Sequence, residues 1–593
     1  MATAAADRPR GFGLLGAALR SRKAGAMLAF GFSSGLPFAL LIGTLTAWLG
    51  EAKVNLATIG LLSWIGLASA FKFLWSPAVD RLRPPGIGRL GRRKGWIALC
   101  QLVIVAALLG LAATDPAASI GRFALIAFVG ALASATQDIA IDAWRIDVAD
   151  AATPVELLSA VYQLGFRTAS IVGGAFALHL ASTMSWPAVY AVMAGLMAAT
   201  LLAGLAAPDT PPPATAAAVL GTGEPDARTR GIALGVVGLC WGWAVVTLIG
   251  FMVSVLAAPP AGAKPPSTAD FLKLYGPLIV AATVLVPLAV AAVLNRAKAG
   301  QAPPRDGEGY RSPQSSGGRG SAARDEPGSE TPPPPGFARR SPSPSRGVVA
   351  ADHLYRALVA PLTDLVERLG WGVLGVIALI LAYPLCYNVW ASFAYPFYLD
   401  YMHYTKDEVA FASKVFGIVM SMTGVALGGV LFLRLGRFPT VLIGAALPIF
   451  GNFLYADLAE GAAHIDMVLG ALRLDRLAAA LGSDQRMARL LLTIAYENIS
   501  TGIAGAAFVA YVSSIVSKKY PAVQYALLSS LTFLIGSMGR GLAGEMFDRL
   551  GYAPVFRWTA LAGLVAILFV LLEWWRSTRV AARAEPGGTG EAA

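Results

Sequence analysis

Apolar stretches recur along almost the whole chain, and each is about as long as a helix that crosses a bilayer. Roughly 20 mostly apolar residues are needed to span the hydrocarbon core. We place about fourteen such spans. They lie near residues 25–48, 56–76, 95–113, 121–144, 156–182, 186–206, 231–257, 275–295, 371–399, 409–434, 439–457, 488–515, 522–545 and 553–575. The pattern therefore predicts an all-α protein that crosses a membrane many times.

The composition favours a membrane protein over a soluble one. Charged residues make up 14% of the chain and hydrophobic residues 56%, whereas ordinary soluble domains contain about 25% charged residues. The net charge of +12 comes from basic residues clustered beside apolar spans, and no soluble stretch is large enough for a nucleic-acid-binding face. No HExxH, Walker A, zinc-ligand or nucleophile-elbow motif occurs. We therefore expect no enzyme, no ATP-driven pump, and no cofactor or metal.

The segments between the spans divide the chain and indicate its orientation. Residues 1–24 and 577–593 are predicted to be tails, and 297–350, rich in Pro, Ser, Gly and Arg, a disordered linker. Residues 351–370 have apolar positions at helical spacing, which predicts an amphipathic helix on the membrane surface. Segment 458–487 is interpreted as a loop insertion. Both tails, the linker and the basic loop after the second span fall on one side, which the positive-inside rule makes cytoplasmic.

Weak internal similarity indicates that two six-helix bundles, 25–206 and 371–576, repeat one another. The stretch LLSAVYQLGFRTASIVGGA resembles LLSSLTFLIGSMGRGLAGE later in the chain, and a Gln-Asp pair in the fourth span corresponds to a Glu-Asn pair in the twelfth. Halves repeated in parallel are typical of the major facilitator architecture. Two further spans within 207–296 belong to neither bundle, and we expect them to pack at the periphery.

Ionisable side chains inside the spans are candidates for transport, because charge at membrane depth is costly unless it faces a partner or a wet cavity. Asp138 and Asp142 are four residues apart and share a helix face, where their repulsion favours proton binding by one of them. Lys72 and Arg167 offer positive charge to an anionic solute or to those carboxylates. Arg145 and Asp147, near the cytoplasmic end of the fourth span, are expected to be gating or snorkelling residues. The alternative is a set of structural ion pairs that hold the helices together.

A basic loop after the second span reads SPAVDRLRPPGIGRLGRRKGW. It contains GxGxxG, but no strand precedes it, so nucleotide binding is not predicted. Asp80 and Arg81 can lock a cytoplasmic gate by hydrogen-bonding helix ends in one state and releasing them in another. Arg92 and Arg93 are assigned to the same gate. The alternative is a solvated loop that only fixes the topology.

Several segments resemble AmpG-type muropeptide permeases in the same order and spacing. They are GFSSGLPFAL, FKFLWSPAVDR, RRKGW, SATQDIAIDAWRID and LGFR in the first half, and EVAFASK, YENISTGIAGAAFVAY and VQYALLSSL in the second. The resemblance implies a bacterial inner-membrane importer of anhydromuropeptides (GlcNAc-1,6-anhydro-MurNAc with or without a peptide), driven by the proton gradient through alternating access and serving cell-wall recycling. Its partners would be this glycopeptide and the lipid bilayer, with no nucleic acid, and the protein would be monomeric.

The resemblance and the positions of the charges together assign roles to individual residues. Proton coupling is assigned to Asp138 and Asp142. Substrate binding is assigned to Lys72, Gln137, Arg167, Glu497 and Asn498. The first helix of the second half departs from the family, because YPLCYNVWASFA places Pro384 and Tyr387 where relatives often have Lys and Asp. Two alternatives therefore stay open: transport of another amphiphilic anion, such as a siderophore or an acyl-coenzyme A derivative, and a receptor that senses wall fragments without transporting them.

Overall fold

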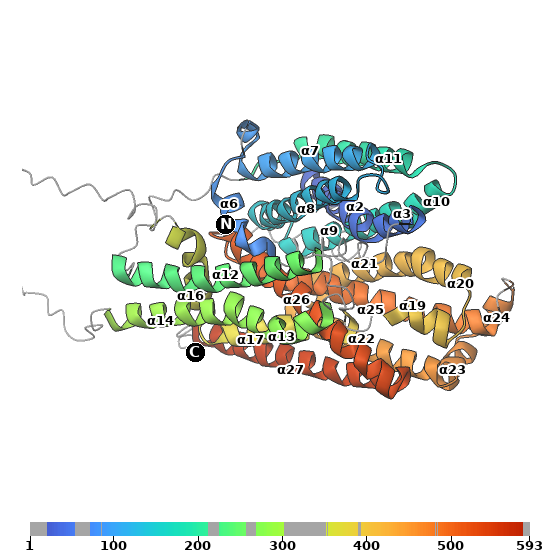
Figure 1. Cartoon of the computed structure of the whole chain (residues 1–593). Helices are drawn as coiled ribbons and strands as arrows, with labels where there is room; N and C mark the ends of the chain where they lie inside the picture. The colour runs from blue at the N-terminus through green and yellow to red at the C-terminus, as the bar shows by residue number, and fades with distance from the viewer. Residues whose placement is uncertain are drawn as a thin grey trace, which may run out of the picture.

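The chain folds into long helices that run roughly side by side (Figure 1). The computed structural model describes residues 21–53, 71–84, 86–210, 225–256, 268–301, 352, 354–388, 393–480, 482 and 484–584. Within these ranges every regular element is helical, so the predicted all-α class is confirmed.

The first half begins with a helix that changes its winding. α2 (Arg22–Phe38) carries Pro37, whose missing N–H interrupts the α-helical ladder, and the chain continues as a π-helical turn, η1 (Ala39–Thr44). The other helices of this half are α3 (Leu45–Glu51), η3 (Lys72–Leu74), α6 (Ser76–Arg81), η4 (Gly88–Leu90), α7 (Arg92–Ala112), α8 (Ile120–Val148), α9 (Val155–Ser170), η5 (Ile171–Phe176), α10 (Ala177–Ala181) and α11 (Trp186–Leu205). The extra segment forms α12 (Ala227–Leu256), α13 (Thr268–Val280), η7 (Ala281–Leu285) and α14 (Val286–Gln301).

The second half begins with a sharp bend. α16 (Ala360–Leu369) ends at Gly370, which has a φ of 57°, and meets the next helix at 102°. The predicted surface position of α16 stays a prediction, but its direction across the other helices is suited to it. The remaining helices are α17 (Gly372–Ala382), α18 (Leu385–Asn388), α19 (Ala394–Pro396), η9 (Phe397–Tyr401), α20 (Lys406–Ala410), η10 (Phe411–Phe416), α21 (Gly417–Leu435), α22 (Arg437–Ala459), α23 (Ala463–Ala471), α24 (Leu474–Ala480), α25 (Gln485–Ile515), α26 (Pro521–Leu550) and α27 (Tyr552–Ala584).

Among the described residues, 11 helices are long and apolar enough to cross a membrane, or up to 12 if the bent pair of α16 and α17 forms one span. The predicted spans 56–76 and 522–545 are not among the eleven. The first falls mostly outside the described residues, and the second lies in α26. Most of the predicted linker 297–350 is also outside the described ranges. The total of about fourteen spans therefore stays a prediction.

The extra helices α12, α13 and α14 lie where the two halves meet. Trp241 of α12 contacts Phe73 of the first half edge-on, with ring centroids 5.2 Å apart, and α13 packs against α26 of the second half. The side-chain amide of Asn295 in α14 donates to the carbonyl oxygen of Thr363 in α16 at 3.0 Å. Leu239 is 75% exposed on the outward face. The extra helices are therefore at the periphery, yet they touch both halves.

Glycines allow α2 and α9 to approach until their backbones touch. A Cβ atom at Gly31 would lie 2.1 Å from the carbonyl oxygen of Tyr162, and one at Gly165 would lie 2.2 Å from that of Leu28. The same kind of contact joins α21 and α25 at Gly424. Small residues are the usual means of packing helices in lipid, where no hydrophobic effect drives the helices together.

Substitution of Gly31 by Ala should therefore destabilise the protein, although alanine is the better helix former. The added methyl group forces α2 away from α9, and overpacking of this kind costs about 1–3 kcal/mol of unfolding free energy. Gly25→Ala is the matched control, because it lies on the same helix with nothing within 4 Å of the added Cβ. Thermal unfolding in detergent should show a lower Tm for Gly31→Ala only. Equal Tm values for the two variants would contradict the close contact.

Candidate functional site

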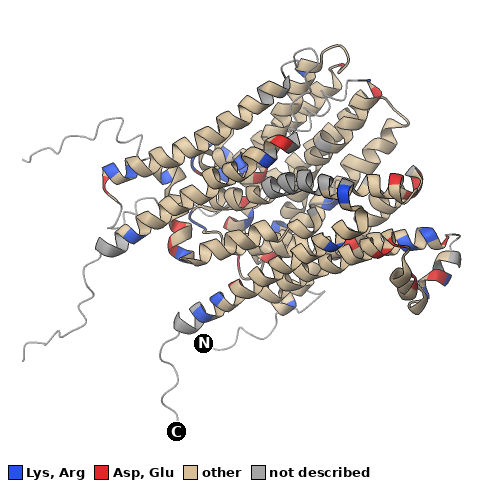
Figure 2. Cartoon of the chain, turned by 60° about the horizontal axis from the view of Figure 1, so that its bottom comes forward, with Lys and Arg blue, Asp and Glu red and all other residues tan. Residues whose placement is uncertain are grey.

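Charged residues gather towards the helix ends, and long stretches of helix carry none (Figure 2). The few charged side chains within the bundles are therefore the natural candidates for a functional site, because each requires compensation by the protein at membrane depth. Among the described residues, the two groups of interest lie within the first half and at the boundary between the halves.

Asp138 lies within α8 and faces α2 and α9. Its carboxylate accepts a short hydrogen bond from the hydroxyl of Ser34, whose oxygen lies 2.8 Å from the hydroxyl of Tyr162. The neighbouring Gln137 is fully buried, and its amide donates to the backbone carbonyl of Ser33 at 3.0 Å. Asp138 itself is only half-buried. Its hydrogen-bond partner among the described residues is a neutral hydroxyl, so no salt bridge prevents it from taking up a proton.

Asp142, one turn further along α8, has different partners. One carboxylate oxygen lies 3.3 Å from the ammonium of Lys72, and the other lies 3.0 Å from the guanidinium of Arg145. Arg145 also lies over the ring of Tyr525 in α26, with its guanidinium carbon 5.0 Å from the ring centroid. The side chains of Lys72, Asp142 and Arg145 are 5%, 7% and 0% exposed. Of the two roles predicted for Arg145, snorkelling is thus wrong, because a buried ion triad holds its side chain inside the protein, and gating stays a prediction.

Arg167 lies on α9 at the boundary between the halves. It interacts electrostatically with Tyr387 of α18 and with Glu497 of α25, both in the second half. Its Nε is shielded from solvent and has no hydrogen-bond partner among the described residues. A guanidinium carries five N–H donors in a planar fork that matches a carboxylate. Arg167 is therefore the cation best placed to receive an anion from outside the protein.

Glu497 belongs to a hydrogen-bonded chain in the second half. The hydroxyl of Tyr455 in α22 donates to its carboxylate at 2.9 Å, and the hydroxyl of Tyr398 in η9 lies 2.5 Å from that of Tyr455. Asn498 donates to the same carboxylate at 3.4 Å and to the carbonyl of Ile494 at 2.9 Å. Glu497 and Asn498 are half-buried, whereas both tyrosines are buried.

The structure separates residues that the sequence placed together. The alternative pairing of Arg167 with Asp138 and Asp142 is not found. Lys72 and Arg145 pair with the two carboxylate oxygens of Asp142, and Asp138 accepts a hydrogen bond from Ser34. The geometry of α9 explains this. Tyr162 and Arg167 are five residues apart, which is about 140° around a helix; Tyr162 faces α2, so Arg167 faces the second half. Of the predicted substrate-binding residues, Lys72 and Gln137 are engaged within the first half, and their contact with a solute stays a prediction. The others are half-buried, namely Arg167, Glu497 and Asn498.

Three of the four predicted gating residues form a cluster between α6, α7 and the end of α8. The guanidinium of Arg93 is fully buried and bridges Asp80 at 2.7 Å and Asp147 at 2.9 Å. Arg92 donates a short hydrogen bond to the backbone carbonyl of Asp80. The fourth, Arg81, has an exposed side chain. The cluster ties the loop to α8, and its predicted opening and closing stays a prediction.

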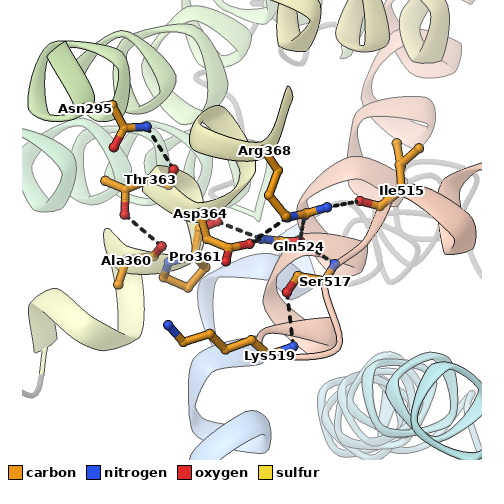
Figure 3. Close-up of polar contacts among 10 residues, drawn as sticks. All are labelled: Asn295, Ala360, Pro361, Thr363, Asp364, Arg368, Ile515, Ser517, Lys519 and Gln524. Carbon is orange, nitrogen blue, oxygen red and sulfur yellow. Dashed lines mark hydrogen bonds and ion pairs between the residues drawn. The ribbon is translucent and has the colours of Figure 1, made fainter. Parts of the chain in front are cut away.

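At the same end of the molecule, Gln524 joins α16 to the start of α26 (Figure 3). Its amide nitrogen donates to the carbonyl of Pro361 at 2.8 Å and to Asp364 at 2.9 Å, while its oxygen accepts from Arg368 at 2.9 Å. Gln524 is fully buried. It thereby fixes the helix turn that carries Tyr525, whose ring lies against Arg145 of the first half.

No group of three or more His, Cys, Asp or Glu side chains in the described part of the chain could hold a metal ion. Tyr162, Tyr455 and Tyr525 could not be singled out from the sequence, because a tyrosine in an apolar span is ordinary. Their proximity to charged groups depends on the packing of helices that are far apart in the chain.

Comparisons with known proteins identify the relatives of this chain. A segment of 187 residues, 31% of the chain, is 40% identical to the anhydromuropeptide permease of Escherichia coli K12 and spans 37% of that protein. Over 544 residues, 91% of the chain is 23% identical to the putative transporter AmpG 4 of Rickettsia felis, of which it covers 94%. The chain is a relative of the AmpG transporters. The resemblance inferred from its motifs is thereby confirmed.

This chain also has the expected fold. It is similar to the proton:xylose symporter XylE, with a TM-score of 0.51 and 12% identity over 94% of this chain and 95% of that one. Similarity to the human organic anion transporter MFSD10 gives a TM-score of 0.50 and 14% identity, over 93% of this chain and 99% of that one. At such identities the likeness concerns the fold alone, which is that of the major facilitators. No protein-family model matches the chain.

The ion triad predicts that loss of the carboxylate of Asp142, within α8, costs far more stability than loss of that of Asp150, which follows the end of α8. Asp142→Asn leaves Lys72 and Arg145 buried without a counter-charge and should cost about 3–5 kcal/mol of stability. Asp150→Asn is the control: Lys23 lowers the pKa of Asp150 through a hydrogen bond, but 49% of that carboxylate side chain is exposed. Solvent screening limits such a bridge to about 0–1 kcal/mol. Thermal unfolding in detergent measures the stability of both variants. Similar losses of stability in the two would contradict the ion triad.

Proposed function

We propose that this protein is a proton-coupled secondary transporter that imports anhydromuropeptides across the bacterial inner membrane for cell-wall recycling. The names of its relatives support the solute class. The proposal is carried by the Nε of Arg167, which has no hydrogen-bond partner among the described residues and lies at the boundary between two bundles of the major facilitator fold. In such transporters the site lies near the bilayer midplane, between halves that rock against one another.

The solute would be held by its negative charge. A short wall peptide ends in a carboxylate, and Arg167 can bind a carboxylate with two parallel hydrogen bonds. From the second half, Glu497, which interacts electrostatically with Arg167, and the neighbouring Asn498 would offer an acceptor and a side-chain amide for the hydroxyl and amide groups of the sugars. Contacts from both halves make binding sensitive to their relative position, which is what alternating access requires.

Proton coupling would fall to Asp138 rather than to Asp142. Asp138 is bonded to the neutral hydroxyl of Ser34, whereas both oxygens of Asp142 face a cation. A proton on Asp138 therefore replaces a hydrogen bond but breaks no ion pair. Ser34 lies on α2 and Tyr162 on α9, so a change in this network acts on two closely packed helices of the first half.

Uptake of labelled anhydrodisaccharide-peptides into inverted and right-side-out vesicles, with and without a proton gradient, tests the proposal. We expect accumulation that collapses with the gradient. Accumulation of a siderophore or an acyl-coenzyme A derivative in place of the muropeptide would favour the other transported anions. Binding of wall fragments without uptake would favour the receptor.

Asp138→Asn should abolish gradient-driven accumulation while the protein still inserts and still binds solute, because the amide cannot carry the coupled proton. The accumulation ratio in vesicles should fall to that of simple equilibration. Asp150→Asn, which removes an exposed carboxylate at the end of the same helix, should accumulate solute as the wild type does. If Asp138→Asn concentrates solute at a near wild-type level, Asp138 does not couple transport to protons.

Arg167→Lys should weaken solute binding by roughly tenfold or more, although it retains the charge, because an ammonium cannot reproduce the planar fork. The same change at Arg122, exposed at the start of α8, should have no effect. Titration of purified protein with labelled solute measures both. Equal affinity of Arg167→Lys and wild type would show that Arg167 does not contact the solute.

A further inference from the structure

A cavity of about 550 Å³ lies between four helices of the second half. Its walls include Phe450 on α22, Val468 on α23, Leu492 on α25 and Arg557 on α27. Cavities of roughly 300–1,000 Å³ with mostly apolar walls and a few polar groups are typical of sites for small ligands. The cavity is near the end of the bundle that carries α23 and α24, opposite to α16 (Figure 1).

The cavity is separate from the candidate functional site. Tyr496 of α25 lines the cavity, whereas the next residue, Glu497, interacts with Arg167 across the boundary between the halves. Successive residues of a helix point about 100° apart. One face of α25 is therefore turned to the cavity and another to the boundary, so a ligand of the cavity is not the solute held at the boundary.

The walls of the cavity change from apolar to charged along the direction of the helices. Phe450 and Phe453 are 59% and 43% exposed, and both lie within α22. Asp457 lies close to the end of α22 and Glu460 just beyond it. From Phe450 to Asp457 the helix rises about 10 Å. Because the ends of a membrane helix reach the polar headgroups and its middle faces the acyl chains, this order matches that of a lipid molecule.

Four charged or titratable side chains line the rim of the cavity. The guanidinium of Arg557 forms an ion pair with Glu460. The carboxylate of Asp457 lies 2.7 Å from the ring Nδ1 of His464, and that carboxylate side chain is 13% exposed. Asp457 thus has an imidazole as its side-chain partner, whereas Glu460 has a permanent cation.

The rim has one negative charge in excess. Its two carboxylates face one guanidinium, and an imidazole is ordinarily neutral above about pH 7. Arg489, which also interacts with Asp457, does not change this balance, because it forms a salt bridge with Asp466. A ligand that brings a cation to the rim is favoured for this reason, and one that brings only negative charge is disfavoured.

We propose that the cavity is a specific site for a phospholipid whose headgroup carries a primary ammonium, as that of phosphatidylethanolamine does. An acyl chain lies along Phe450, the phosphate accepts hydrogen bonds from Arg557, and the ammonium donates to Asp457 and Glu460. The inference also gives a role to the insertion 458–487, because α23 within it forms one wall of the cavity. It does not depend on which solute the protein carries.

Native mass spectrometry of the purified full-length protein, freed of lipid in detergent at about pH 7.5, tests the proposal. The protein is titrated with phosphatidylethanolamine, phosphatidylcholine and phosphatidylglycerol that have identical acyl chains. The first should bind more tightly than the third by about fivefold or more, the size of a partly exposed ionic contact. Phosphatidylcholine should bind with intermediate affinity, because its trimethylated ammonium has no N–H donor. Equal affinities, or tighter binding of phosphatidylglycerol, would overturn the proposal.

Val468→Trp tests whether the cavity is the site. The indole fills the space of the acyl chain, so the tight binding of phosphatidylethanolamine should be lost. Met467→Trp is the matched control, because this neighbour on α23 is 72% exposed and does not line the cavity. The two variants binding the lipid equally well would show that it binds elsewhere.

Glu460→Gln tests the recognition of the headgroup and leaves the shape of the rim unchanged. The preference for phosphatidylethanolamine over phosphatidylglycerol should shrink, because the excess negative charge is removed. Asp407→Asn, an exposed carboxylate at the start of α20, should keep the wild-type preference. An unchanged preference in Glu460→Gln contradicts the proposed contacts. A dimer of the wild type that retains no lipid would assign this face to a second copy of the chain and overturn the proposal.

Discussion

Charge inside a membrane has to be compensated by the protein, since neither lipid nor bulk water can do so, and this constraint organises the interior of the chain. The first half meets it with direct ion pairs. Lys72 and Arg145 share Asp142, and Arg93 is bridged by Asp80 and Asp147. These clusters join helices that are distant in sequence. The close glycine contacts between α2 and α9 bring Ser34 and Tyr162 to Asp138 in the same way.

Arg167 is the departure from this pattern. It lies on the face of α9 turned away from the ion triad, and its counter-charge in the second half is near but not bonded. A buried N–H donor such as the Nε of Arg167, which has no partner among the described residues, costs free energy unless a ligand or water accepts its hydrogen bond. The position of Arg167 at the boundary also explains why both halves are needed for a site. The first half supplies the cation, and the second supplies Glu497 and the tyrosines that fix it.

The sequence was sufficient for the fold and for the list of charges, but not for their pairing. Apolar spans of about 20 residues have one stable form in a bilayer, so the helices of both halves could be predicted from patterning alone. The intramembrane Asp138, Asp142, Arg167 and Glu497 stand out for the same reason. Their partners could not be inferred, because packing against other helices sets the rotation of each helix about its own axis, and therefore the direction of its side chains. This is why the alternative pairing of Arg167 with the carboxylates of α8 is not found, and why snorkelling was one of the two roles expected of Arg145, which is buried.

The central claim is that solute and proton cross the membrane together through the boundary between the halves. The most direct test uses purified protein in liposomes without any imposed pH gradient, with the external pH followed by a dye. Addition of anhydromuropeptide outside should drive protons inward with the solute, so the external medium becomes more alkaline while the solute enters. Entry of the solute with no change in external pH would contradict proton-coupled transport.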